Sequence, residues 1–266
     1  MELSTSPSKY NIRFFKKKSM MIEKPYITVY TITYNEEHII RFFIEHYRKM
    51  FPHCKIVVND NFSTDKTREI AESYSCEIRD YDTNNQSDNK LLRDLKNNTW
   101  KNATTDWVVV CDVDEIIQIT QKELIEEEKN GFNIITPHGW QMINNKNNNI
   151  DLPSMVEGWY DWTYDKKILF NKKYVKEINY EYGAHRAKPI GDNLKETPHG
   201  KYILTHYKYI SKEHSLKRRD ILNERWSKFN IDVLWKNINK KLIYCPDDYW
   251  NEWYNKPLTN IKHLMK

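Results

Sequence analysis

The chain has 266 residues, of which 39% are hydrophobic and 14% aromatic, enough for a sizeable core in one large domain. Its net charge of +5 and pI of about 8.7 suit an anionic ligand but fall short of the concentrated basic surface typical of nucleic-acid-binding proteins. The four scattered cysteines include no C-x-x-C pair, which argues against a zinc site and favours a reducing compartment.

Residues 1–24 are polar and basic and follow no periodic pattern, so we expect a flexible arm. Lys16–Lys18 beside Phe14 and Phe15 make this arm a candidate for peripheral contact with a membrane surface. The arm lacks the apolar core of a signal peptide, and no apolar run reaches the roughly 20 residues that span a bilayer. We therefore predict a cytoplasmic protein that is neither secreted nor transmembrane.

From Pro25 onward, β-branched segments alternate with helical stripes. We expect strands at 26–33, 55–59, 75–81 and 106–112. We expect helices that begin at Asn35, begin at Ser63 or Thr64 and end near Tyr74, and run through Leu91 to Trp100, with Asn35 and Ser63 or Thr64 as caps. Such alternation predicts an α/β fold whose mostly parallel central sheet carries helices on both faces.

The second half of the sequence is less regular. We expect helices at 121–129 and 211–229, strands at 132–136 and 203–209, a mobile loop at 144–149, and a helical flank over the last 37 residues or so. The predicted organisation is therefore an arm (1–24) followed by one domain in two halves, 25–120 and 121–266.

The most informative segment is the apolar run that begins at Trp107 and ends in Asp112, Asp114 and Glu115. A buried strand cannot hold these carboxylates without partners, so we expect them at its carboxyl end, the edge where α/β sheets bind ligands. Two aspartates separated by one residue suit Mn²⁺ or Mg²⁺ when substrate phosphates complete the coordination shell. The alternative is a solvated turn after a core strand.

Polar turns also follow the first two predicted strands, at Tyr34-Asn35-Glu36 and at Asp60–Asp65. These turns and the later Asp-x-Asp resemble, in order and spacing, those of family 2-type glycosyltransferases with the GT-A nucleotide-sugar fold. The resemblance covers about residues 25–120. It extends more loosely to Gly183-Ala184-His185 and Leu204-Thr205-His206-Tyr207.

The resemblance implies a metal-dependent glycosyltransferase that moves a sugar from a nucleoside-diphosphate donor to a hydroxyl of a glycan, lipid-linked or protein acceptor in glycan synthesis. It places 25–120 as the nucleotide-sugar half and 121–266 as an irregular acceptor-side half. A UDP-linked hexose is the first expectation, because Asp60 suits the N–H of uracil. Nucleic acid is not an expected partner. A nucleotidyltransferase and a non-catalytic nucleotide- or sugar-binding module are the alternatives.

The resemblance also implies roles for particular residues. Tyr34, Asn35 and Asp60 would hold the nucleoside, and Asp112 would contact the ribose or the metal, which Asp114 would bind directly. Lys90, Arg93 and Lys167 are candidates for diphosphate contacts, each against the alternative of a solvated position. A histidine commonly completes the metal site, and both His185 and His206 are candidates.

Family 2 members are usually inverting, which requires a general base on the acceptor hydroxyl. Glu157 and Asp161 are our candidates, because they lie in an aromatic stretch where rings could stack on sugar faces while a carboxylate takes the proton.

Overall fold

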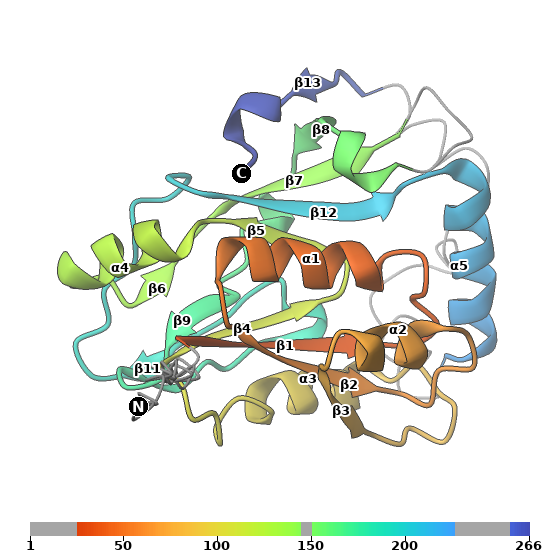
Figure 1. Cartoon of the computed structure of the whole chain (residues 1–266), viewed down its shortest axis with the longest axis horizontal. Helices are drawn as coiled ribbons and strands as arrows, with labels where there is room; N and C mark the ends of the chain where they lie inside the picture. Colours follow the sequence, from red (N-terminus) through yellow and green to blue (C-terminus); the bar gives the residue numbers. More distant parts are fainter. Residues whose placement is uncertain (1–25, 145–150, 227–255) are drawn as a thin grey trace, which may run out of the picture.

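The computed structural model describes residues 26–144, 151–226 and 256–266, and it contains two large sheets and a two-stranded ribbon, with helices around them (Figure 1). The predicted N-terminal arm, nearly all of the predicted 144–149 loop and most of the predicted C-terminal flank lie outside these residues. Within the described residues, no helix combines the length and apolar character needed to cross a membrane.

The central sheet has six strands and is parallel over its first four. The last two strands come from the second half of the chain. The fifth strand runs antiparallel to the fourth, and the sixth runs antiparallel to the fifth. In spatial order the strands are β3 (Glu77–Asp80), β2 (Lys55–Asp60), β1 (Ile27–Thr33), β4 (Trp107–Asp112), β9 (Leu169–Asn171) and β6 (Ile134–Ile135). The predicted α/β fold with a mostly parallel central sheet is confirmed, and the two predicted halves share that sheet.

A second, mixed sheet of five strands is built from the chain after Asp114. In spatial order its strands are β13 (Thr259–Asn260), β8 (Glu157–Tyr160), β7 (His138–Ile143), β12 (Ile203–Tyr209) and β5 (Glu115–Gln118). Strands β10 (Val175–Glu177) and β11 (Ile190–Gly191) pair as a separate antiparallel ribbon. Because β5 begins directly after the turn that ends β4, the Asp112–Glu115 segment connects the two sheets.

Five α-helices and four short 3₁₀ helices complete the described part of the chain. They are α1 (Ile40–Met50), α2 (Thr67–Ser73), α3 (Asn89–Asn98), α4 (Gln121–Lys129), α5 (Lys212–Glu224), η1 (Leu152–Ser154), η2 (Trp162–Tyr164), η3 (Tyr182–Ala184) and η4 (Lys262–Leu264). Figure 1 shows α1 between the two sheets and α5 beside the carboxyl ends of β1 and β12.

Helix α1 joins the two sheets into one core. Its predicted apolar stripe is fully buried, and the Tyr47 hydroxyl donates to the Glu115 carbonyl on β5 at 3.2 Å. The ring of Phe42 lies 5.1 Å from that of Tyr207 on β12. Valines alternate along β4, with Val109 facing this core and Val108 and Val110 facing a second cluster on the other side of the sheet.

Two predicted helix starts are wrong. Helix α1 begins at Ile40 and not at Asn35, because Asn35 has a φ of 54° and its side chain binds the neighbouring turn instead of capping the helix. Helix α2 begins at Thr67, where Asp65 and not Ser63 or Thr64 accepts the first backbone N–H, at 2.9 Å.

Helix α4 has the predicted bounds and begins with a complete capping box. Thr120 Oγ1 accepts from the Glu123 amide at 3.3 Å, and the Glu123 carboxylate accepts from the Thr120 amide at 2.9 Å. We expect Thr120→Ala to lower the free energy of unfolding by about 1 kcal/mol, measured by urea denaturation. Thr120→Ser keeps the acceptor and is the control; equal losses in both variants would contradict this role for the hydroxyl.

Candidate active site

A cavity of about 470 Å³ opens at the carboxyl edge of the central sheet. Its walls come from the turn after β1, the β4–β5 turn, the η2 and η3 segments, β12 and one face of α5. The strand register places Thr33 beside Asp60 and Ile32 beside Asp112, so the first, second and fourth strands end at the same level. The polar turns therefore meet at one edge, as the sequence predicts.

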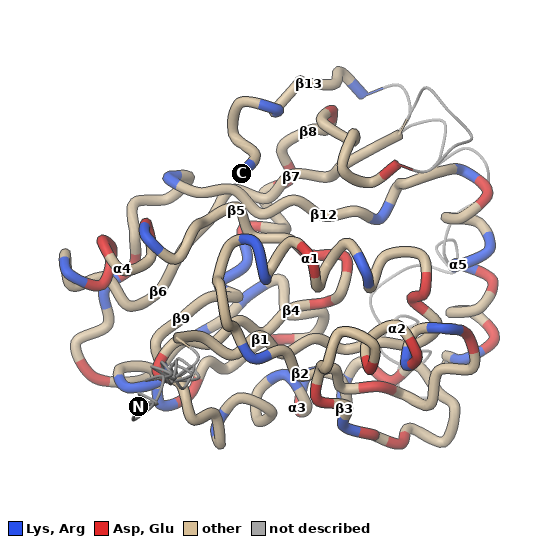
Figure 2. Tube along the Cα trace, in the orientation of Figure 1, with Lys and Arg blue, Asp and Glu red and all other residues tan. Residues whose placement is uncertain are grey.

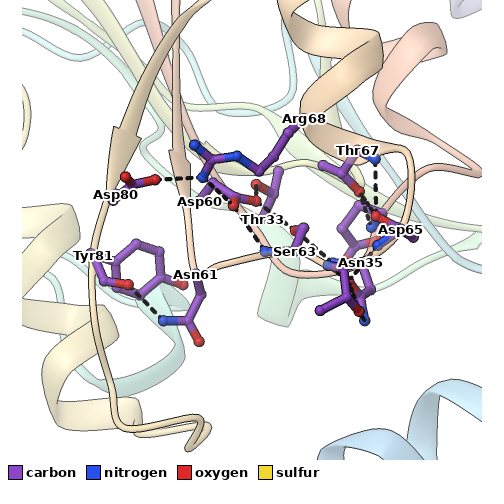
Figure 3. A network of polar contacts seen from close by, with 12 residues as sticks. Thr33, Asn35, Asp60, Asn61, Ser63, Asp65, Thr67, Arg68, Asp80 and Tyr81 are labelled. Carbon is purple, nitrogen blue, oxygen red and sulfur yellow. Dashed lines mark hydrogen bonds and ion pairs between the residues drawn. The ribbon is translucent and has the colours of Figure 1, made fainter.

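The turns after β1 and β2 are held together by Asn35 (Figure 3). Its side-chain Oδ1 accepts from the Thr64 backbone amide at 2.7 Å, and the Asn35 backbone amide donates to Ser63 Oγ at 2.9 Å. The left-handed backbone of Asn35 is one that asparagine adopts more readily than most residues. Asn35 lines the cavity, but its side chain is used to fix the shape of the two turns.

Asp60 lies behind the cavity wall and is fully buried. Its carboxylate accepts from Thr33 Oγ1 at 3.0 Å, from the Ser63 amide at 2.9 Å and from Arg68 at 2.9 Å (Figure 3). The next residue, Asn61, lines the cavity and donates its side-chain N–H to the Tyr81 carbonyl at 2.7 Å. The structure therefore brings Asn61, which the sequence analysis missed, to the position expected of Asp60.

Tyr34 also lines the cavity, and Arg225, another lining residue, covers its ring. The guanidinium carbon lies 3.2 Å from the ring centroid, and Arg225 also donates to Asn61 Oδ1. Arg225 follows the last turn of α5, a helix along which basic and acidic positions both occur (Figure 2). A planar cation thus occupies the space in front of Tyr34 and Asn61.

Asp112 and Asp114 line the cavity, and a lysine and a histidine face them. Lys96 Nζ lies 2.7 Å from Asp112 Oδ2, and His206 Nε2 lies 3.3 Å from Asp114 Oδ2. Burial alone would raise the pKa of Asp114, but His206, Arg218 and Lys166 outweigh it and hold that pKa well below its usual range. Both carboxylates are therefore charged and available to a cation.

Glu115 is part of the framework under these aspartates. It is 1% exposed, pairs with Lys166, and accepts from the Asp112 amide at 3.1 Å. Lys166 also donates to the Gly183 carbonyl at 3.2 Å, which connects the turn to η3. Lys166 lines the cavity, whereas the predicted Lys167 lies outside its wall and pairs with Glu196 at 2.5 Å.

Both candidate histidines line the cavity, one on each side of Tyr164. The Tyr164 ring stacks on His206 with centroids 4.1 Å apart and meets His185 edge-on at 4.9 Å. His185 Nδ1 lies 2.8 Å from the Thr163 carbonyl, and burial together with the nearby Lys166 lowers the pKa of His185 to about 4. His185 is therefore neutral near pH 7, and only His206 contacts one of the two aspartates.

The α5 side of the cavity contributes Arg218, which pairs with the buried Glu36. Glu36 is 4% exposed, and burial raises its pKa to about 7 even though Arg218 opposes the shift. Among the residues that the structure describes, its Oε2 has no hydrogen-bond partner, and His38 Nε2 lies 3.6 Å from it. The sequence alone points to no role for either residue: Glu36 is named only as part of the turn after the first strand, and Arg218 lies nearly two hundred residues away on a helix without a family motif.

The remaining predicted site residues lie outside the cavity wall. Lys90 is at the start of α3, where its amide donates to the capping Asp88 at 2.8 Å, and Arg93 pairs with Asp94 at 2.6 Å. Glu157 begins β8. Asp161 accepts from Gln141 and from the Thr163 amide.

The donor set suits a divalent cation that shares its shell with a substrate. Among residues 26–144, 151–226 and 256–266, no three His, Cys, Asp or Glu side chains form a ready metal cage. Asp114 and His206 nevertheless face each other across 3.3 Å, with Asp112 on the same turn. Carboxylate and imidazole ligands fit Mn²⁺, and substrate oxygens or water would supply the other positions.

A protein-family model described as Glycosyl transferase family 2 matches residues 28–187, which is more than half of the chain. The chain belongs to this family. The predicted family and GT-A fold are confirmed, and with them the predicted enzyme class, a glycosyltransferase. The matched residues include every polar turn at the cavity. The cavity wall formed by β12 and α5 lies outside the match.

Solved structures similar to this glycosyltransferase include TarS (residues 1–349) of S. aureus, with 15% identity and a TM-score of 0.41 over 75% of this chain and 64% of that one. The mannosyltransferase PcManGT of Pyrobaculum calidifontis, in complex with GDP-Man and Mn²⁺, matches at 13% and 0.44 over 82% and 66%. Glucosyl-3-phosphoglycerate synthase of Mycobacterium tuberculosis, with Mn²⁺ and UDP, matches at 17% and 0.32 over 43% and 44%. The chain thus spans less than two thirds of the length of each of these three structures. A comparison with curated proteins gave no match.

The buried pair of Glu115 and Lys166 provides a test of the framework. We expect Lys166→Met to lower the free energy of unfolding by about 3–5 kcal/mol, because it leaves a buried carboxylate without a counter-charge. The matched control is Lys167→Met, which removes a more exposed pair and should cost less than about 1 kcal/mol. Urea denaturation of both variants measures the difference, and similar losses would contradict the structural role of Lys166.

Glu36 provides a pH-dependent test in metal-free protein. Its folded-state pKa of about 7 lies above the ordinary carboxyl value, so the folded state binds an extra proton at intermediate pH and wild-type stability falls as pH rises through this interval. Glu36→Gln does not titrate. From about pH 5 to about pH 8, its free energy of unfolding should therefore rise relative to wild type, by at most about 3 kcal/mol. A difference that stays constant with pH would contradict the raised pKa.

Proposed function

We propose that this glycosyltransferase uses a divalent cation to move a sugar from a nucleoside-diphosphate donor, with UDP favoured, to an acceptor hydroxyl. The observation that carries the proposal is the cavity itself. It is lined by the planar side chains of Tyr34 and Asn61 and by the charged Asp112 and Asp114, with His206 beside Asp114. A nucleotide sugar needs these two environments, one for the base and one for the diphosphate with its cation.

The nucleoside end of the donor is assigned to Tyr34 and Asn61. The Asn61 side chain keeps its N–H on the Tyr81 carbonyl, so its Oδ1 faces the cavity as an acceptor. An amide oxygen can accept the ring N–H of uracil, the part that the sequence analysis gave to Asp60. Arg225 and Thr83 Oγ1 both donate to that oxygen, and Arg225 also covers the Tyr34 ring, so we assign Arg225 the second face of the base slot.

The diphosphate end is assigned to the Asp112–Asp114 turn and the cations around it. Asp114 and His206 would hold Mn²⁺ or Mg²⁺ directly, with Asp112 reaching the ribose or the metal and His185 as the second candidate imidazole. The cation would act as a Lewis acid for the charge that develops on the leaving diphosphate. Lys96, Lys166 and Arg218 supply fixed positive charge near the same turn and take the role that we expected of Lys90, Arg93 and Lys167.

The transfer is proposed to invert the anomeric centre in one displacement, which needs a general base on the acceptor hydroxyl. Glu157 and Asp161 remain the candidates from sequence, although neither lines the cavity. Measuring transfer and donor hydrolysis separately in Glu157→Gln and Asp161→Asn tests them, since a base is needed for transfer. Glycan, lipid-linked and protein hydroxyls remain the proposed acceptors, and a cytoplasmic location remains a prediction.

We expect UDP with Mn²⁺ to raise the melting temperature of the protein, because ligand at about 100 times its dissociation constant stabilises the folded state by roughly 2.7 kcal/mol. Asp114→Ala should abolish the metal-dependent part of the shift. Asp192→Ala removes an exposed carboxylate outside the cavity wall and should leave the shift unchanged. If neither UDP nor any other nucleoside diphosphate gives a metal-dependent shift, the donor assignment fails.

A further inference from the structure

A chain of hydrogen bonds extends from His206 away from the cavity. His206 Nδ1 lies 2.7 Å from Gln141 Oε1, and Gln141 Nε2 lies 3.1 Å from Asp161 Oδ2. The other Asp161 oxygen, Oδ1, accepts from the Thr163 amide at 3.0 Å and from Thr163 Oγ1 at 2.6 Å. Gln141 is 2% exposed and His206 5% exposed, so water does not compete freely for these contacts.

The charge of Asp161 sets the direction of every bond in the chain. An ionised carboxylate only accepts hydrogen bonds, so the Gln141 NH₂ group must face Asp161 and the amide oxygen must face His206. That oxygen can only accept, so His206 Nδ1 must carry a hydrogen. In the neutral ring the lone pair is then on Nε2, the atom that lies 3.3 Å from Asp114 Oδ2.

We propose that Gln141 and Asp161 are positioning residues that keep His206 protonated on Nδ1 and so direct the Nε2 lone pair to the cation site beside Asp114. This inference rests on the proposed metal-dependent function. The Tyr164 ring stacked on His206 restricts the tilt of the imidazole, while the amide fixes its rotation and proton position. Outer partners of this kind commonly change metal affinity by about 10–100-fold.

The inference gives Asp161 a role different from that of a general base, and one substitution separates the two. In Asp161→Asn, the side-chain oxygen stays with the two Thr163 donors, so the new NH₂ group faces Gln141. The Gln141 amide must then turn over and present its own NH₂ to His206 Nδ1. The imidazole has to accept there and moves its proton to Nε2, where it blocks the cation.

The double variant Gln141→Glu/Asp161→Asn restores the original direction. The NH₂ group introduced at position 161 donates to the carboxylate introduced at position 141, and the other oxygen of that carboxylate accepts from His206 Nδ1. Asp165→Asn is the matched control. Asp165 accepts from the amide of Gly139, which lies on β7 like Gln141, at 2.7 Å, but it forms no hydrogen bond with His206, Gln141 or Asp161.

The experiment has two readouts on the folded protein. Long-range ¹H–¹⁵N NMR of the histidine rings, in metal-free protein at alkaline pH, reports which His206 nitrogen carries the hydrogen, with His206→Gln used for assignment. Calorimetry with Mn²⁺ in the presence of UDP measures cation affinity. We expect an Nδ1 hydrogen in wild type, the control and the double variant. We expect an Nε2 hydrogen with about 10–100-fold weaker Mn²⁺ binding in Asp161→Asn.

An Nε2 hydrogen in wild type, or an unchanged tautomer in Asp161→Asn, would overturn the inference. An altered tautomer with unchanged Mn²⁺ affinity would overturn its connection to the cation. A failure of the proposed function gives a different result, since wild type would then bind no Mn²⁺ in the presence of UDP. The NMR result would still show, independently of the metal, whether Gln141 and Asp161 set the position of the His206 hydrogen.

Discussion

The candidate active site depends on the basic side chains that face the carboxylates at the end of β4. A core strand leads directly into Asp112, Asp114 and Glu115, and each acid has a lysine or histidine partner from a different part of the chain. Lys96 comes from α3, Lys166 from the segment after η2, and His206 from the second sheet. Without these partners the turn would hold like charges in a poorly solvated place, and the apolar strand before it could not stay buried.

This requirement explains why the second half of the chain folds against the first. The turn continues into β5, which pairs with β12 so that Glu115 lies beside His206 in the register. The same turn therefore starts the second sheet and brings the histidine to the aspartates. A substitution that shifts β12 by one residue would turn His206 to the other face of the sheet and separate the two parts of the site.

Local patterns predicted most of the first half, because strands, turns and the Asp-x-Asp end are encoded by residues close together in sequence. Thus β1, β2 and β4 lie within a residue of the expected bounds, and in the second half α4 and β12 also lie where expected. The errors come from tertiary contacts. Asn35 binds the next turn instead of capping a helix. At the end of β2 the residue that lines the cavity is Asn61, one position after Asp60. Lys166 and Arg218 have no local signature, since their importance comes only from the acids that face them.

The position of Arg225 has an energetic consequence for the donor. Its guanidinium already covers the Tyr34 ring and binds the Asn61 oxygen, so the proposed base slot is filled by the protein's own side chain. A base that enters on that side exchanges one ring contact and one hydrogen bond for another pair of the same kinds. The measured affinity for the donor then reflects the difference between its contacts and those of the arginine. It scales with the fraction of molecules in which the arginine has left the slot.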